Sequence, residues 1–341
     1  MPRTVLLRDW IARQFPDRAC RIEPASADAS FRRYFRVTLE DGATRIVMDA
    51  PPEHEDCRPF LKVAALLRAA GVNAPEVYAE DLAQGFLLLS DLGATTYLDR
   101  LDAASAPRLY RDACSALIAM QRAPLAADAL PAYDRALLER ELQLFPEWFV
   151  SRHLGVTLDS TQQATLRTVF DALLANNLAQ PQVFVHRDYH SRNLMLIEGA
   201  GVPAGFPANP GVLDFQDAVL GPITYDAVSL FRDAYIDWEE GQELDFTIRY
   251  WEAARQAGLP VHADFADFYR DYEWMGAQRQ LKVLGIFARL CHRDGKDGYL
   301  KDMPRVLGYL RRTCERYLEL RPLARLLDKI EQRPVDVGYT F

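Results

Sequence analysis

Three polar side chains in the middle of the chain have the types and the spacing that phosphoryl transfer requires. Asp188 and Asn193 lie in a His-Arg-Asp-x-x-x-x-Asn stretch, and Asp214 ends a later apolar run. In such a centre one carboxylate accepts the proton of the attacking hydroxyl, while an amide and a second carboxylate hold magnesium. We therefore predict a phosphotransferase with Asp188 as its catalytic base. Asn193 and Asp214 are the predicted ligands of Mg²⁺, which prefers oxygen donors.

Two histidines flank the predicted base. His186, Asp188 and His190 form a His-x-Asp-x-His pattern that is also compatible with a transition-metal site. Magnesium explains Asn193 and Asp214 better than a transition metal does. We therefore interpret His186 as a structural residue that shapes the loop, and we expect His190 near the acceptor substrate.

Two further aspartates follow the predicted metal ligands. Asp217 lies three residues after Asp214 and is a candidate ligand for a substrate hydroxyl. Asp226 lies at the start of a predicted helix, where an aspartate commonly caps the first turn. It could also brace the catalytic loop, and the two structural roles are compatible.

The elements that must position these residues fall into two parts. Before residue 93, β-favouring runs around a Gly-containing turn predict a small sheet, and after it helical spacing dominates. The sequence thus predicts an α+β protein in which a small sheet-rich part precedes a larger helical part. The predicted strands are 31–39, 44–48, 77–78 and 86–89, and the predicted helices are 6–15, 60–70, 96–101, 106–122, 134–154, 161–178, 225–238, 244–257, 265–291 and 304–319.

The composition argues against several classes of protein. The chain has 341 residues and a formal net charge of −8, which does not favour nucleic acid or an anionic membrane as a partner. Its five cysteines are scattered without a C-x-x-C pair, as expected for reduced thiols in the cytoplasm. Asp9 interrupts the apolar N-terminal stretch, so we predict no signal peptide. No apolar run reaches the roughly 18 residues of a membrane-spanning helix.

Four other segments carry a resemblance to a known family. Together with the catalytic loop, they are similar to the aminoglycoside-phosphotransferase family of small-molecule kinases, and within it to bacterial anomeric kinases for N-acetylmuramate and N-acetylglucosamine. The resemblance implies a bilobal protein-kinase-like fold, with an N-lobe of residues 1–92 and a mainly helical C-lobe of residues 93–341. It also implies ATP as co-substrate, Mg²⁺ as cofactor and phosphorylation of a C1 hydroxyl in cell-wall recycling. The segments are 25–36, 46–52, 145–149 and 281–287.

Two departures from the kinase pattern concern the nucleotide phosphates. Ser30–Val37 stands where a kinase has G-x-G-x-x-G-x-V, yet it contains no glycine, and Met48 takes the place of the phosphate-binding lysine. Because a triphosphate needs positive charge nearby, we expect Arg32 or Arg33 to replace that lysine, with Ser30 in the same loop. The alternative is that both arginines are solvated loop residues.

The adenine is expected between the hairpin and a hinge strand. By strand parity, Val37 and Ile46 would lie against the base. Leu89, Ser90 and Asp91 would belong to the hinge, whose backbone pairs with adenine. A buried strand that only joins the two parts would explain the same apolar residues.

The sugar is expected to bind in the helical part. Trp148 could stack on a sugar ring and Glu147 could bind hydroxyls, although a core position for the tryptophan is the alternative. Arg279 could bind an acidic sugar with Lys282 one turn away, whereas a solvated helix face would also explain both residues. The full predicted substrate set is Asp188, His190, Asp217, Glu147, Trp148 and Arg279.

Two other functions are compatible with the sequence. A kinase of another small alcohol, such as an aminoglycoside, choline or homoserine, would use the same catalytic residues. A catalytically weak nucleotide-binding regulator would explain the missing lysine and glycines, but it would not be expected to retain the base and both metal ligands. We expect a cytoplasmic monomer whose partners are ATP and an N-acetylated amino sugar.

Overall fold

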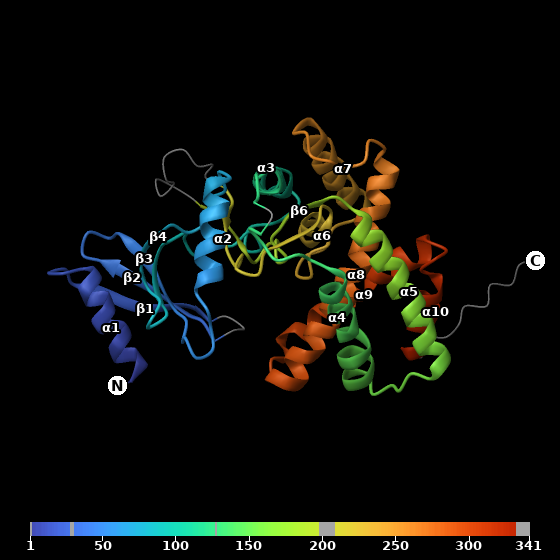
Figure 1. Ribbon diagram of the computed structural model, residues 1–341, viewed down its shortest axis with the longest axis horizontal. Helices are drawn as coiled ribbons and strands as arrows, with labels where there is room; N and C mark the ends of the chain where they lie inside the picture. Colours follow the sequence, from blue (N-terminus) through green and yellow to red (C-terminus); the bar gives the residue numbers. More distant parts are fainter. Residues whose placement is uncertain (1, 28–30, 127, 198–208, 332–341) are drawn as a thin grey trace, which may run out of the picture. The chain divides into compact units, whose positions relative to one another are not determined.

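The structure, a computed structural model, describes residues 2–27, 31–126, 128–197 and 209–331 (Figure 1). Ser30, predicted for the phosphate loop, lies outside the described residues. The chain divides into two compact units, the first made of residues 1–123 and 192–217 and the second of residues 124–191 and 218–341. The predicted lobe boundary between residues 92 and 93 differs from this division and stays a prediction.

The first unit contains a five-stranded sheet with the strand order β1-β2-β3-β5-β4. The predicted hairpin is confirmed as β2 and β3, which pair from Arg33 opposite Asp49 to Thr38 opposite Thr44. The sequence does not predict β1, because Pro24 and the bulge beside it interrupt the strand pattern. The strands are β1 (Cys20–Ala27), β2 (Arg33–Leu39), β3 (Thr44–Asp49), β4 (Val77–Asp81) and β5 (Phe86–Ser90).

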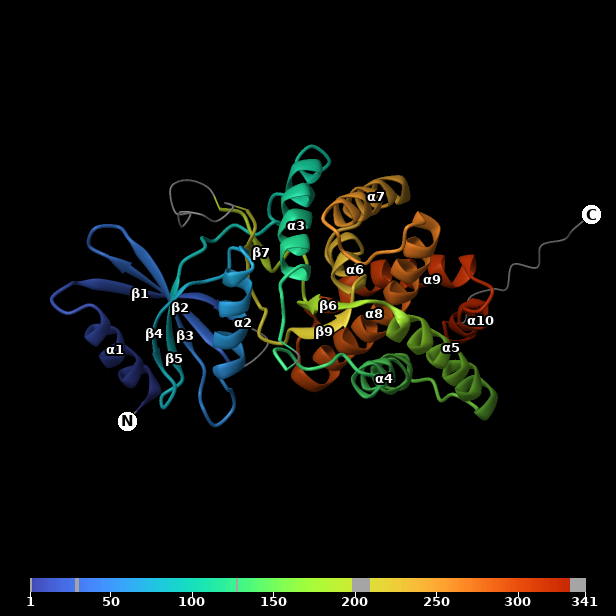
Figure 2. The same cartoon turned by 45° about the horizontal axis from the view of Figure 1, so that its top comes forward.

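Helix α1 (Arg3–Gln14) packs its apolar residues against one face of this sheet (Figure 2). Val37 belongs to that core and is fully buried. The register places Val37 opposite Arg45, whereas Ile46 lies opposite Arg36. Because residues directly opposite share a face and neighbours alternate, Val37 and Ile46 point to opposite faces. The prediction that both contact adenine is therefore wrong, and Val37 is a core residue.

The later segment of the first unit is joined to the earlier one by backbone hydrogen bonds. The Tyr97 N–H donates to the Leu194 carbonyl over 2.7 Å, and the Val212 N–H donates to the Asn73 carbonyl over 2.8 Å. The helix predicted at 96–101 is wrong, since these residues form turns beside β7. The remaining elements of this unit are α2 (Arg58–Ala69), α3 (Ala106–Gln121), β7 (Leu194–Met195) and β8 (Gly211–Val212).

The second unit is mainly helical and is built around α8, a helix of 30 residues that packs against α4, α5, α6 and α9. The helix predicted at 134–154 begins as α4 and continues as a π-helix from Phe145, next to Pro146, which lacks a backbone donor. The elements are α4 (Arg135–Leu144), the π-helix η1 (Phe145–His153), α5 (Ser160–Ala179), β6 (Gln182–Val185), β9 (Val219–Pro222), α6 (Tyr225–Phe231), α7 (Glu240–Gln256), α8 (Phe265–Asp294), the 3₁₀ helix η2 (Asp297–Asp302), α9 (Met303–Arg316) and α10 (Arg321–Ile330).

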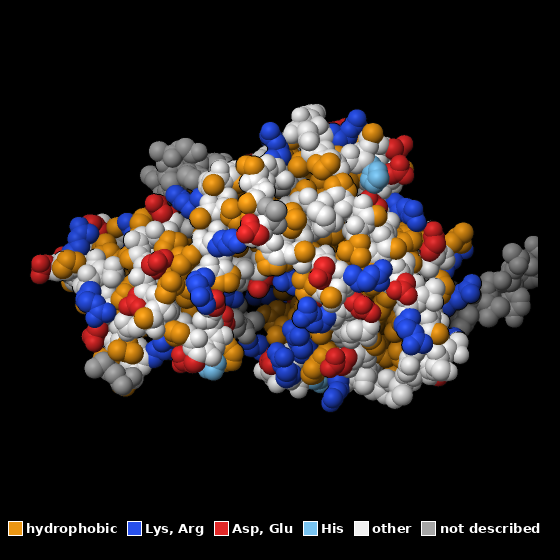
Figure 3. All heavy atoms as spheres, viewed as in Figure 1, with side chains coloured by type: hydrophobic (Ala, Val, Ile, Leu, Met, Phe, Trp, Pro, Cys, Tyr) orange, Lys and Arg blue, Asp and Glu red, His pale blue; other side chains and the backbone are white. Residues whose placement is uncertain are grey.

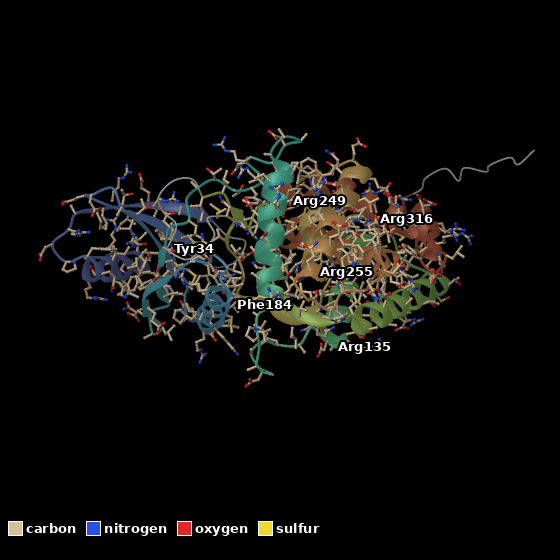
Figure 4. All side chains as sticks on the ribbon, turned by 90° about the horizontal axis from the view of Figure 1, so that it is seen from above. Tyr34, Arg135, Phe184, Arg249, Arg255 and Arg316 are labelled. Atoms are coloured by element: carbon tan, nitrogen blue, oxygen red, sulfur yellow. The ribbon has the colours of Figure 1, made fainter. Side chains whose placement is uncertain are left out.

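The surface carries both signs of charge. Figure 3 shows basic and acidic side chains spread over one face. In the second unit, Arg249 on α7 pairs with Asp245 at 2.7 Å and Arg316 on α9 pairs with Glu273 at 2.5 Å; both arginines are labelled in Figure 4. Among the described residues, we find no helix with the length and apolar character needed to cross a membrane.

Candidate active site

The predicted catalytic loop follows β6 in the second unit and is fixed by two buried side chains. The backbone N–H groups of His186 and Arg187 donate to the two carboxylate oxygens of Asp226, over 2.7 and 3.1 Å. The His186 Nδ1 accepts the Asp188 N–H at 3.2 Å. Thr224, not Asp226, is the N-cap residue of α6, so the capping prediction is wrong. These contacts support the predicted structural roles of His186 and Asp226 in holding the loop.

The loop turns through a left-handed residue directly before the predicted base. Arg187 has φ 78°, a conformation that costs a non-glycine residue about 1–3 kcal/mol. Such a residue persists only when its surroundings hold it, and the bond from its N–H to Asp226 is one such contact. The turn therefore fixes the backbone from which the Asp188 side chain projects.

The electrostatic environments of the two loop carboxylates differ. Burial alone would raise the pKa of the Asp188 carboxyl, but the charges of Lys282, His190 and Arg279 hold its pKa below the usual value. Burial raises the pKa of Asp226 to about 7, although it accepts two backbone N–H groups. Asp188 is therefore ionised at neutral pH and able to accept a hydrogen bond from a hydroxyl.

The two predicted metal ligands lie together in the first unit. The Asn193 Nδ2 donates to the Asp214 Oδ2 at 3.3 Å, and the Leu213 N–H donates to the Asn193 carbonyl at 2.9 Å. Asp214 is also left-handed, with φ 61°, and its Oδ1 accepts from Gln216 at 2.9 Å. Both ligands are partly exposed.

Their donor set fits magnesium. In the described part of the chain no three His, Cys, Asp or Glu side chains gather as a metal site. A carboxylate and an amide oxygen suit an ion that takes its other ligands from phosphates and water. When bound, Mg²⁺ would supply positive charge to the phosphates beside Asn193 and Asp214.

Two residues predicted to contact the substrate, Asp217 and His190, lie close in the sequence to Asp214 and Asp188. Asp217 is exposed, and its Oδ2 lies 3.4 Å from the Gln216 Nε2. The His190 ring meets the ring of Tyr235 edge-on, with centroids 5.3 Å apart. Their contacts with substrate stay predictions.

The arginines predicted for the phosphates have carboxylate partners. Arg33 is half exposed and forms an ion pair with the fully buried Asp49, which also accepts from the Arg3 Nε at 2.6 Å. The Arg32 Nε lies 4.0 Å from Glu55. To bind phosphate, either arginine would have to leave its carboxylate partner or contact the carboxylate and the phosphate together. Their role in binding the nucleotide phosphates therefore stays a prediction.

The pairing of β5 with its neighbours limits which residues of the predicted hinge can offer a backbone N–H to adenine. β5 lies between β3 and β4, and the Ser90 N–H already donates to the Glu76 carbonyl at 2.8 Å. The Ser90 Oγ also accepts the Glu76 N–H, at 2.9 Å. A backbone donor for adenine would therefore come from beyond Ser90, beginning with Asp91, while Leu89 is buried within the sheet.

A cavity of about 330 Å³ lies beside the residues that follow β5, within the first unit. Arg36 crosses it, with its Nε 2.6 Å from the Asp91 carboxylate and its Nη2 2.9 Å from the Gly93 carbonyl. Sequence reasoning did not place Arg36 at this cavity, because the register that pairs it with Ile46 is known only from the structure. The cavity is lined by Arg36, Thr44, Asp91, Leu92, Gly93, Ala94, Leu196 and Ile197.

The residues predicted for the sugar lie on two elements of the second unit. Glu147 and Trp148 belong to the π-helix, where the Arg152 guanidinium lies 5.8 Å from the Trp148 ring centre. Arg279 and Lys282 are buried on α8, 5 % and 7 % exposed. The interpretation of these two as a solvated helix face is therefore wrong.

Residues 21–265 match the model of the phosphotransferase enzyme family, over more than half of the chain. The chain belongs to this family. The predicted membership and the predicted phosphotransferase activity are thereby confirmed. The α+β prediction is also confirmed, with a sheet-rich N-terminal region and a largely helical remainder.

Relatives of this phosphotransferase carry a more specific name. It is 53 % identical over 309 residues to an N-acetylmuramate/N-acetylglucosamine kinase of Pseudomonas aeruginosa, covering 91 % of the chain and 88 % of the relative. It is 48 % identical over 346 residues to the kinase of the same name from Neisseria meningitidis serogroup B, covering 100 % of both. A crystal structure of ADP-bound aminoglycoside phosphotransferase APH(2'')-Ib matches with a TM-score of 0.56, 14 % identity and coverage of 89 % and 97 %. That match supports the protein-kinase-like fold.

Proposed function

We propose that this phosphotransferase transfers the terminal phosphoryl group of ATP to the C1 hydroxyl of N-acetylmuramate, N-acetylglucosamine or both. The observation that carries the proposal is the name shared by two relatives that are about half identical over nearly their full lengths. The proposal includes Mg²⁺ as cofactor, a cytoplasmic monomer and a role in cell-wall recycling.

The residues of the chain would divide the chemistry between them. Asp188 would accept the hydrogen bond, and then the proton, of the attacking C1 hydroxyl. Its depressed pKa supports a role that is mainly positioning, since a weak base takes the proton late. Asn193 and Asp214 would hold the metal that neutralises the phosphates, so the protein contributes orientation and charge rather than a covalent intermediate.

The buried Arg279 supports an anionic group on the acceptor. It is 5 % exposed and lies close enough to Asp188 to lower the pKa of that carboxyl, and its Nε has no hydrogen-bond partner among the described residues. A buried guanidinium donor without a partner is costly, and a carboxylate is its best complement. We therefore include Arg279 as the group that binds the lactyl carboxylate of N-acetylmuramate.

The test is product analysis with a panel of alcohols. Purified protein with ATP and Mg²⁺ is incubated with N-acetylmuramate, N-acetylglucosamine, an aminoglycoside, choline and homoserine, and the products are followed by phosphorus NMR. The proposal expects an anomeric phosphate from at least one amino sugar, and none from a sample lacking Mg²⁺. Transfer only to another alcohol, or to a sugar hydroxyl other than C1, would overturn it.

A matched substitution tests the role of Arg279. Arg279→Gln should raise the KM for N-acetylmuramate about ten-fold while changing that for N-acetylglucosamine less, because only the first carries a carboxylate. An equal change for both sugars would assign Arg279 a role other than binding the lactyl group.

A further inference from the structure

Glu141 on α4 is a buried carboxylate that the proposed chemistry does not use. It is 5 % exposed and has partners from three directions. The Arg187 Nη2 lies 2.5 Å from its Oε1, the Lys282 Nζ lies 2.9 Å from the same oxygen, and the Tyr133 hydroxyl donates to its Oε2. Burial would raise the pKa of Glu141, but Lys282 and Arg187 hold it below the usual value. Glu141 is therefore an ionised group shared by two cations.

The packing of α8 against the end of α4 creates this arrangement. A Cβ atom at Gly285 would lie 2.5 Å from the backbone of Leu144, so only glycine permits the close approach. Lys282 precedes Gly285 by three residues, and Glu141 precedes Leu144 by three residues. Residues three apart share a helix face, so the crossing places lysine and glutamate side by side.

Arg187 links this cluster to the predicted base. It precedes Asp188 directly and is the left-handed residue of the loop, with φ 78°. Its guanidinium lies 5.5 Å from the Tyr133 ring centre and is paired with Glu141. Its backbone N–H is held by Asp226. The strained residue thus has one anchor on its backbone and another on its side chain.

We propose that Glu141 is a positioning residue for Asp188. Its ion pair with Arg187 holds the left-handed turn from which the Asp188 side chain projects. Its ion pair with Lys282 balances the charge of a lysine that also acts electrostatically on the Asp188 carboxylate. Removing the charge of Glu141 would leave the buried Lys282 and the partly buried Arg187 without their common partner, and the loop would shift to relieve them. This inference rests on the proposed role of Asp188 in phosphotransfer.

A second buried carboxylate of the same unit provides a matched control. Glu243 on α7 is 1 % exposed and also pairs with an arginine and a tyrosine: its Oε1 lies 2.6 Å from the Arg232 Nε and 3.2 Å from the Tyr272 hydroxyl. Its Oε2 accepts from Arg312 on α9. These partners belong to α8, α9 and the end of α6, not to the loop of residues 186–190. Loss of either glutamate removes a buried ionic contact, but only loss of Glu141 disturbs the predicted base.

The experiment compares Glu141→Gln with Glu243→Gln in the full chain. Thermal unfolding, kcat and KM for ATP and for the acceptor are measured at a temperature where both variants are folded. Both should lose stability. Glu141→Gln alone should lower kcat about ten- to a hundred-fold with KM for ATP changed less than about three-fold, because a small misplacement of a catalytic group acts on the chemical step. Equal kcat losses in the two variants would reduce Glu141 to a stabilising residue and overturn the proposal.

A milder variant covers the case in which Glu141→Gln does not fold. Tyr133→Phe removes only the hydroxyl that donates to Glu141 and keeps the ring beneath Arg187. It should lower kcat several-fold at unchanged KM for ATP, and a kcat equal to that of the parent would contradict the proposal.

The test of Glu141 can be distinguished from the test of the proposed function. If the parent phosphorylates a different alcohol, the sugar assignment fails but the comparison of Glu141 with Glu243 proceeds on that alcohol. A parent that transfers phosphate to no alcohol overturns both.

Discussion

The loop that carries Asp188 and the segment that carries Asn193 and Asp214 are neighbours in the sequence, but they are held in different ways. The loop is fixed from within the second unit by the buried Asp226. The segment rests on two strands of two residues each, and its partly exposed ligands bond to one another. The comparison teaches that the predicted base projects from a loop held by a buried carboxylate, whereas the predicted metal ligands are partly exposed and stand on short strands.

The largest expected effect comes from replacing Asp188, the predicted base that the loop positions. Asp188→Asn should fold and bind ATP like the parent, while kcat falls about a hundred- to ten-thousand-fold, the range of general-base contributions. Stopped assays and titration calorimetry measure the two effects. Asp245→Asn, on the exposed face of α7, is the control. Turnover within a few-fold of the parent would remove Asp188 from the role of base.

Removing a metal ligand tests the second half. Asp214→Ala should weaken ATP binding in the presence of Mg²⁺ by about ten- to a hundred-fold, as expected when a site loses a ligand, and should change Mg²⁺-free binding much less. Calorimetric titrations with and without Mg²⁺ give both values. Should binding fall equally in the two conditions, Asp214 is not a metal ligand.

The anchoring of the loop predicts a pH dependence of stability. The pKa of Asp226 is about 7 in the folded protein and near 3.9 in an unfolded chain. Its contribution to stability is therefore full below about pH 4 and is lost as the pH rises through 7.

Asp226→Asn should flatten this dependence in urea unfolding between pH 5 and pH 8. It should also lower stability by about 1–3 kcal/mol, because an amide cannot accept both backbone N–H groups. Asp245→Asn on the exposed face of α7 serves as the control. An unchanged slope in the Asp226 variant would show that the carboxylate is ionised throughout this range.

The smallest expected effect concerns the arginines of the first unit. Arg32→Ala or Arg33→Ala should raise the KM for ATP a few-fold and leave the KM for the acceptor unchanged, because one partly screened cation is worth little when a carboxylate already shares it. Met48→Lys should bring no improvement if an arginine supplies the charge. Unaltered ATP kinetics in both alanine variants would direct attention to Arg36 or Arg45.

Residue type and spacing are sufficient to predict those parts of the site whose chemistry requires particular side-chain atoms. The pairing of Asn193 with Asp214 follows from a carboxylate and an amide at the ends of adjacent apolar runs, and the structure brings them together. The hairpin and most helices follow from apolar periodicity, which reports burial directly.

Register and burial could not be predicted in the same way. A strand pattern does not state which residue lies opposite which, so the prediction for Val37 names the wrong face of the sheet. Lys282 and Arg279 read as solvated because charged residues are rarely buried without partners, and the partner of Lys282 is Glu141, 141 residues earlier in the chain. Long-range pairing of this kind leaves no local signal.

The division of the first unit into two stretches of sequence has a consequence for biosynthesis. Residues 2–123 leave the ribosome before residues 192–217, yet Asn73 and Tyr97 take their backbone partners from the later stretch. The sheet under α1 can therefore form early, since its strands all lie within the first 90 residues. Asn193 and Asp214 join only after the intervening helices have been translated, a closure over a long loop that is slow to form. The nascent chain would thus bring the two predicted magnesium ligands to the first unit only after its sheet has formed.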